Sequence, residues 1–326
     1  MFAMRTVQSQ LKQTLLLALI ASALLPAPDA FARQTASRAD KISDAQFEAL
    51  PLDRSRQNHL IVRAFINGKP ALLGVDTGAP FSAIAINRRK HYGLVPIAGP
   101  SRLTVNGAAS AVGIAKSLRI GGFTLEDQPM VALNFGSESR GGRIRVEPEI
   151  DGLLGADILF PMRAVLDCRR QLLILNLDPN SEKPTPGIDY TGFTSIPIHV
   201  GAGYNLYVDG AVNGTPAQLL VDTGAFVTLL HRPFVKQMKI PVHNTRFRFA
   251  GVNMGGANVQ VARIRRLSVG SINFDGHRVG VIDLGVLINA ESLETKRPVA
   301  GLLGGELLQL HHGIIDFGTR RLYLKG

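Results

Sequence analysis

Short runs of hydrophobic residues, each closed by turn-forming residues, follow one another along most of the chain. An apolar run at 60–66 leads to Asn67-Gly68, and a second run at 71–75 leads into an Asp-Thr-Gly tripeptide. An Asn-Gly pair between two such runs predicts a β-hairpin. Short helices are expected at 156–159 and 305–310, after each Gly-Leu-Leu-Gly. The hydrophobic pattern therefore predicts a mostly β fold.

The whole pattern occurs twice. At an offset of 146, residues 50–52 (Leu-Pro-Leu) fall on 196–198 (Ile-Pro-Ile), and the match runs without a gap to Ala79 on Ala225. The offset has grown to 149 where the Gly-Leu-Leu-Gly at 152–155 falls on 301–304. A drift of this size is typical of loop variation between duplicated units.

This repeat divides the chain into two lobes. Lobe one is expected at 50–178 and lobe two at 196–326, joined by a polar, proline-rich linker at 179–195. Residues 33–49 have no counterpart in lobe two, and we interpret them as a tail or a short pro-segment.

The first 32 residues differ from the rest. Arg5 and Lys12 precede an apolar run at 15–25, and Ala30-Phe31-Ala32 follows as a small-x-small cleavage site. The alternative is a membrane anchor, but a membrane-spanning helix needs about 20 apolar residues. Residues 1–32 are therefore predicted to be a cleaved secretory signal. The mature protein is expected to be exported, periplasmic or secreted, without stable membrane insertion.

Composition argues against a nucleic-acid partner, a disulfide and a metal site. The formal net charge is +11, but the basic runs are short and lack interleaved aromatics, so no nucleic-acid partner is expected. Cys168 is the only cysteine, which rules out an intramolecular disulfide and suggests a core residue. His311 and His312 are adjacent, and on a strand they would point to opposite faces. No metal or cofactor is expected.

The chemistry of the chain centres on two Asp-Thr-Gly tripeptides, at 76–78 and 222–224, each preceded by an apolar run and followed by Ala. A Gly-Leu-Leu-Gly follows each of them further along the chain. With these motifs, both halves resemble the retropepsin and pepsin families of aspartic proteases. The chain looks most similar to the bacterial, single-chain, retropepsin-like group.

The resemblance implies two homologous β-barrel lobes with the active site in a cleft between them. Asp76 and Asp222 would form the catalytic pair, and Thr77 and Thr223 would hydrogen-bond across to the opposite lobe. Gly78 and Gly224 would supply backbone N–H groups close to the carboxylates, where a Cβ would interfere. The expected form is a monomer whose two lobes make an intramolecular pseudo-dimer.

Two carboxylates in contact cannot both ionise, so such a pair shares one proton. The ionised member can take a proton from water while the protonated member hydrogen-bonds a scissile carbonyl. The expected substrate is a peptide or protein. Ala79 and Ala225 stand where pepsins commonly carry a hydroxyl residue, which suggests an activity optimum closer to neutral.

Two glycine-containing hairpin tips are candidate flaps over the substrate. They contain Asn106 and Gly107 in lobe one and Gly255 and Gly256 in lobe two. An ordinary hairpin turn is the alternative for both.

One other function is open at this stage. An exported binding or scaffold protein could retain the acid-protease fold with little proteolytic activity. Two intact acidic motifs argue against it, because a binding module has no evident need for two buried acids sharing a proton.

Overall fold

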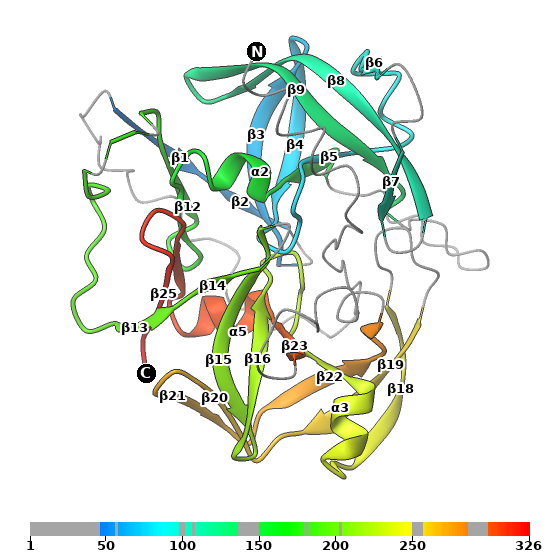
Figure 1. The fold of residues 1–326 in the computed structure, drawn as a ribbon, viewed down its shortest axis with the longest axis vertical. Coiled ribbons are helices and arrows are strands. Elements are labelled where there is room, and N and C mark those ends of the chain that lie inside the picture. Colours follow the sequence, from blue (N-terminus) through cyan, green and yellow to red (C-terminus); the bar gives the residue numbers. More distant parts are fainter. Residues whose placement is uncertain are drawn as a thin grey trace.

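The computed structural model describes residues 46–55, 58–97, 102–105, 108–135, 150–178, 180–181, 183–201, 204–249, 257–285 and 299–326. The predicted signal at 1–32, most of the segment at 33–49 and the four flap candidates lie outside these residues. The described chain forms two lobes that meet at a shared sheet (Figure 1). Its described helices are all too short to cross a membrane.

Strands dominate both lobes, as predicted. In the first half they are β1 (Phe47–Pro51), β2 (Asp53–Arg54), β3 (Leu60–Ile66), β4 (Lys69–Val75), β5 (Ala83–Ala85), β6 (Val95–Pro96), β7 (Arg102–Val105), β8 (Ala108–Ile120), β9 (Phe123–Leu133), β10 (Gly152–Leu154), β11 (Val165–Asp167) and β12 (Leu172–Asn176). In the second half they are β13 (Thr194–Pro197), β14 (His199–Val200), β15 (Leu206–Val212), β16 (Thr215–Val221), β17 (Leu229–His231), β18 (Val242–Phe249), β19 (Ala257–Arg263), β20 (Arg266–Val269), β21 (Ile272–Asp275), β22 (Arg278–Ile282), β23 (Val299–Leu303), β24 (Ile314–Asp316) and β25 (Arg321–Leu324).

Three short helices complete the described elements: α2 (Ala156–Leu159), α3 (Arg232–Gln237) and α5 (Gly305–Leu310). The first and last have the predicted bounds, and each follows a Gly-Leu-Leu-Gly. Both predicted Asn-Gly hairpins are present as well. Asn67 and Gly68, with φ of 50° and 77°, join β3 to β4, and Asn213 and Gly214 do the same between β15 and β16. Asparagine and glycine tolerate this left-handed backbone better than other residues do.

Lobe one contains a closed barrel. Its strands follow the order β3-β4-β10-β5-β9-β8, and β8 pairs back onto β3, with Ala64 opposite Ile120 and Ile66 opposite Leu118. Every strand of this ring therefore has two neighbours. Closure of this kind leaves no unpaired sheet edge within the ring.

Lobe two repeats this ring with two of its strands divided. The long strand β8 is replaced by β19 and β20, with a break at Ile264 and Arg265, and its partner β9 is replaced by β21 and β22. β20 pairs with β15, so that Gly210 lies opposite Val269 where lobe one has Ala64 opposite Ile120. These pairs follow the offsets 146 and 149 found in the sequence. The predicted mostly β, two-lobed fold is confirmed.

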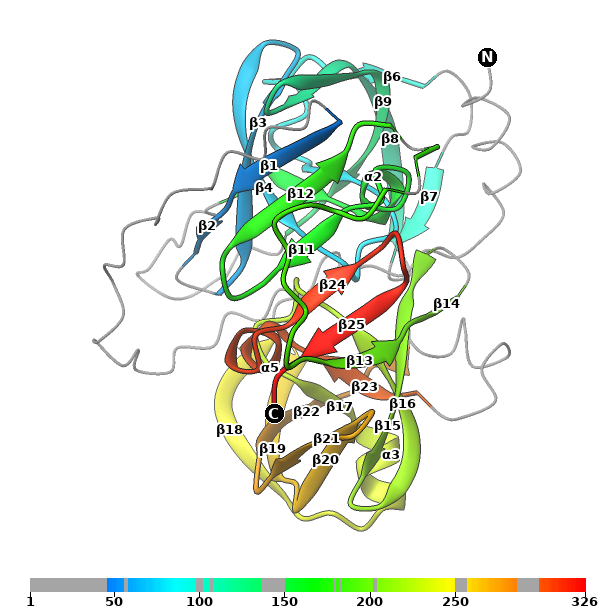
Figure 2. The same cartoon turned by 90° about the vertical axis from the view of Figure 1, so that its left-hand side faces the viewer.

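A six-stranded sheet joins the lobes, in the order β1-β12-β11-β24-β25-β13 (Figure 2). The junction is the antiparallel pair β11–β24, where Leu166 lies opposite Ile315 and Val165 opposite Asp316. Each half contributes three strands, so the junction has the self-complementary pattern of a twofold dimer interface. One hydrophobic cluster extends from lobe one through lobe two and includes Leu166, Cys168 and Ile315. Burial raises the pKa of the Cys168 thiol to about 12, in keeping with the core position predicted for it.

The first strand lies partly inside the segment that we expected to be a tail. β1 begins at Phe47, whose side chain is buried, and it pairs with β12. Residues 47–49 are thus part of the joining sheet. The linker also has a packing role: Ile188, Tyr190 and Phe193 pack on a cluster that includes Phe47.

Candidate active site

The two Asp-Thr-Gly tripeptides lie where β4 and β16 end. The strand formed by each Gly-Leu-Leu-Gly motif runs parallel to the strand that leads into the aspartate: β10 lies beside β4, and β23 lies beside β16. The N–H of Asp76 donates to the carbonyl of Leu154 (3.1 Å), and the N–H of Asp222 donates to the carbonyl of Leu303 (3.0 Å). The second motif thus fixes the chain direction at each aspartate.

Thr77 and Thr223 bond the two loops to each other across the lobes. The Thr77 hydroxyl donates to the carbonyl of Val221 (2.8 Å) and accepts from the N–H of Thr223 (3.1 Å). The Thr223 hydroxyl donates to the carbonyl of Val75 (2.8 Å) and accepts from the N–H of Thr77 (3.1 Å). All four bonds are buried, and they are symmetric between the halves. This is the arrangement that the resemblance implied.

Asp76 and Asp222 are brought together where these two loops meet, and both are shielded from solvent, with exposures of 1% and 0%. Gly78 N–H donates to Asp76 Oδ1, and Gly224 N–H donates to Asp222 Oδ1, both at 2.9 Å. Ala225 N–H adds a second bond to Asp222 Oδ1 (3.0 Å).

Two effects raise the pKa of Asp76 well above its ordinary range. Burial is the larger, and the negative charge of Asp222 adds to it. The backbone N–H groups of Gly78, Ala79 and Gly224 act in the opposite direction but are outweighed. The result is a pair of acids that favours holding a proton between them.

Gly224 shows why one loop needs glycine. A Cβ at this position would lie 2.5 Å from Asp76 Oδ2 and 2.6 Å from its Cγ. Non-bonded atoms do not approach so closely, so any side chain at position 224 would displace the carboxyl group of Asp76. The predicted role of Gly224 in close approach therefore has a geometric basis in this structure.

The family follows from comparison with known proteins. A family model described as aspartyl protease matches residues 62–158 and again 208–307, one match in each lobe. The chain belongs to the aspartyl protease family. Both matches contain an Asp-Thr-Gly and the start of a Gly-Leu-Leu-Gly helix, so the sequence resemblance is confirmed.

Two solved structures match over most of the chain. Basic 7S globulin from soybean matches with 10% identity and a TM-score of 0.44 over 86% of this chain and 95% of its own. The aspartic proteinase from Irpex lacteus matches with 14% identity and a TM-score of 0.46 over 86% of this chain and 97% of its own. Comparison with curated protein sequences finds no match.

Four further residues of this protease fold form hydrogen bonds in pairs close to the Asp-Thr-Gly loops and were not predicted from the sequence. They are Ser82 with Asp157 in lobe one, and Thr228 with Glu306 in lobe two. Ser82 and Thr228 correspond at the offset of 146, and Asp157 and Glu306 at 149. The repeat therefore carried a signal for them, as chemically similar residues at equivalent positions.

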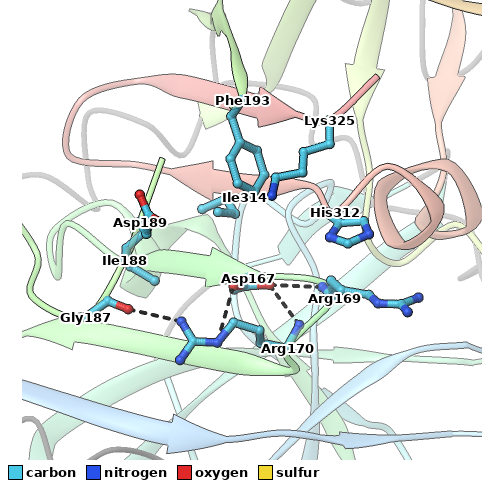
Figure 3. A pocket seen from close by; sticks show the side chains of 10 residues that line it. All are labelled: Asp167, Arg169, Arg170, Gly187, Ile188, Asp189, Phe193, His312, Ile314 and Lys325. Atoms are coloured by element: carbon cyan, nitrogen blue, oxygen red, sulfur yellow. Dashed lines mark hydrogen bonds and ion pairs between the residues drawn. The ribbon is translucent and has the colours of Figure 1, made fainter. Parts of the chain in front are cut away.

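A pocket of about 210 Å³ lies away from this site, on the outer side of the joining sheet (Figure 3). Its lining residues are Asp167, Arg169, Arg170, Gly187, Ile188, Asp189, Phe193, His312, Ile314 and Lys325. None of the predicted site residues is among them. Asp167 accepts hydrogen bonds from the backbone N–H groups of Arg169 and Arg170, which accounts for its buried carboxylate.

The two adjacent histidines do not lie on a strand. His311 follows α5 and lies 2.9 Å from the carbonyl of Lys325 through Nδ1, while His312 has a φ of 53° in the next turn. Over the described part of the chain, His, Cys, Asp and Glu do not cluster in threes as a metal site would require.

Proposed function

We propose that this protein is an aspartic endopeptidase in which Asp76 and Asp222 activate a water molecule to hydrolyse peptide bonds. The observation that carries the proposal is the buried pair of acids, one from each lobe, whose loops are bonded to each other by Thr77 and Thr223. Membership of the aspartyl protease family supports the same reaction class.

The chemistry needs one proton on the pair. The ionised carboxyl group removes a proton from water, and the oxygen of this water forms a bond to the scissile carbonyl carbon. The protonated carboxyl group hydrogen-bonds the carbonyl oxygen and stabilises its developing charge. One of the two protons now on the pair is transferred to the amide nitrogen, which allows the C–N bond to break. The products are a carboxylic acid and an amine, and the pair is left with one proton, as at the start.

The proposed enzyme acts outside the cytoplasm after removal of residues 1–32, as a monomer. This part of the proposal rests on the charged, apolar and small-residue regions of the N-terminal sequence and on the presence of both acids in one chain.

The direct test is to incubate the purified mature protein with a peptide library and identify the products by mass spectrometry. Cleavage at defined bonds, lost in Asp222→Asn, would support the proposal. If the wild-type protein cleaves no peptide at any pH, the result favours the alternative of an exported binding or scaffold protein with this fold.

The pH dependence should show the raised pKa of Asp76. We expect a bell-shaped profile of kcat/KM, because activity requires one carboxyl group protonated and the other ionised. Burial and the charge of Asp222 raise the pKa of Asp76, so the active form should persist well above the ordinary aspartate pKa of about 3.9. Ala79 and Ala225 provide no hydroxyl group to counter this. Activity measured from about pH 2 to 8 at constant ionic strength checks the prediction, and an optimum as acidic as that of a gastric pepsin would contradict it.

A further inference from the structure

The name aspartate loop is used here for the Asp-Thr-Gly-Ala sequence of each lobe, at 76–79 and 222–225. In lobe one, Ser82 follows this loop and connects it to the helix after Gly-Leu-Leu-Gly. Its N–H and its hydroxyl both donate to Asp157 Oδ1, at 2.8 and 2.7 Å. The same hydroxyl oxygen accepts the N–H of Gly155 at 3.0 Å. The Ser82 side chain is fully buried. Asp157, the second residue of α2, is thus bonded to the chain six residues beyond Asp76.

Lobe two repeats this connection with different residues. The N–H of Thr228 donates to Glu306 Oε1 at 2.7 Å, and its hydroxyl oxygen accepts the N–H of Gly304 at 3.0 Å. Glu306 is the second residue of α5, as Asp157 is of α2. An acid on the helix and a hydroxyl after the aspartate loop therefore occur in both lobes.

These contacts act on the loops that hold the acids. In lobe one the N–H of Ala156 donates to the carbonyl of Ala79, and in lobe two the N–H of Gly305 donates to the carbonyl of Ala225, both at 2.8 Å. Packing is tight at the same place, because a Cβ on Gly155 would lie 2.7 Å from the Ala79 carbonyl oxygen. A shift of either helix would therefore move the residue that ends each Asp-Thr-Gly-Ala sequence.

We propose that Asp157 and Glu306 are positioning residues of the peptidase, each holding the aspartate loop of its own lobe through Ser82 or Thr228. The proposal rests on the proposed function, and it extends the site beyond the Asp-Thr-Gly motifs to a second pair of acids.

The two lobes differ in the groups that surround the helix acid, which is Asp157 in lobe one and Glu306 in lobe two. The other oxygen of Asp157 accepts from Gln128 Nε2 at 3.1 Å, and neither Gln128 nor Ser82 carries a charge. Glu306 instead faces a basic group, with His277 Nε2 at 3.5 Å from its Oε1. Among the described residues, only the lobe-two acid thus has a basic group as a hydrogen-bonding or ion-pair partner.

This difference makes the lobe-one contact sensitive to pH. Desolvation raises the pKa of Asp157 to about 7, although the hydrogen bonds from Ser82 oppose the shift. The folded protein therefore keeps a proton on Asp157 that the unfolded chain loses near its ordinary pKa of about 4. Stability from this group is full below about pH 4 and falls as the pH rises to about 7.

Two substitutions of Asp157 separate position from charge. Asp157→Asn keeps an oxygen that can accept from Ser82 but removes the charge, whereas Asp157→Ala removes both. We expect Asp157→Ala to lower kcat about 10- to 100-fold with KM changed less than about threefold, because the aspartate loop moves while the groups that bind substrate remain. Asp157→Asn should retain kcat within about threefold and lose the fall in stability between about pH 4 and 7.

A matched control is Asp127→Ala, on the same strand as Gln128 but exposed and paired with Lys116. It should change neither kcat nor the pH dependence of stability. If Asp157→Ala does not fold, Ser82→Ala carries the same kinetic test, and Glu306→Gln against Glu306→Ala repeats it in lobe two. The proposal would be overturned if Asp157→Ala and Glu306→Ala both kept wild-type kcat. It would also be overturned if Asp157→Asn and Asp157→Ala lost kcat equally.

One readout does not depend on turnover. NMR titration of the side-chain carboxyl carbons reports the apparent pKa values of the Asp76–Asp222 pair. We expect these values to move in Asp157→Ala and to stay near wild type in Asp127→Ala. If the wild-type protein cleaves no peptide, the proposed function fails, but this titration still decides whether Asp157 positions the pair.

Discussion

Asp76→Asn and Asp222→Asn are each expected to lower kcat/KM by about a thousandfold or more. Asparagine keeps the shape of the side chain but can neither take a proton from water nor share one with its partner. The two acids act as a unit, so each single substitution should cost nearly as much as the double one. Initial rates on a peptide chosen from the library screen measure the effect.

The same variants should fold normally. Burial and mutual repulsion oppose ionisation of the pair, as the raised pKa of Asp76 shows. A neutral asparagine removes that cost, so both variants should be at least as stable as wild type at neutral pH. Asp53→Asn is a suitable control, because Asp53 is exposed and pairs with Arg63 on the surface. Turnover that survives either substitution in the pair would refute the assignment.

Thr77→Val is expected to lower the free energy of unfolding by roughly 2–6 kcal/mol. Valine has the shape of threonine but leaves the carbonyl of Val221 without its donor and the N–H of Thr223 without its acceptor, both in a buried place. Each unpaired backbone group costs about 1–3 kcal/mol. Denaturant unfolding followed by circular dichroism measures the loss.

Thr77→Ser is the matched control, since it keeps the hydroxyl and should recover most of that stability. Thr223→Val should behave like Thr77→Val, because its bonds are the symmetric ones. In the double variant the two effects should not add, since both residues take part in one network. A loss below about 1 kcal/mol in both single variants would mean that these bonds do not stabilise the junction of the lobes.

Much of the fold could be predicted because the two halves of the sequence can be aligned with each other. The offset between halves predicted which strands correspond, and the barrel pairing of Ala64 and of Gly210 follows it in the structure. Hairpins at Asn67 and Asn213 needed only local turn chemistry. These features depend on neighbours in the sequence or on the duplication.

Other features depend on contacts between distant segments. Phe47 lies in a stretch with little periodicity, and it becomes a strand because β12, more than a hundred residues later, pairs with it. Ser82 contacts Asp157, 75 residues later in the chain, so neither residue has a local pattern that indicates the contact. The break that separates β19 from β20 is likewise set by lobe two itself and has no counterpart in β8.

The junction at β11 and β24 pairs Leu166 with Ile315 as two identical subunits would pair. A peptide substrate has a direction, from amino to carboxyl end, whereas a twofold dimer must offer identical surfaces to both sides of the bond that it cuts. Joining the halves in one chain releases them from that requirement. Each can accumulate its own substitutions, as Ser82 against Thr228 and Asp157 against Glu306 already show. In the proposed peptidase, the covalent link therefore allows the two lobes to recognise the two sides of a peptide bond by different contacts.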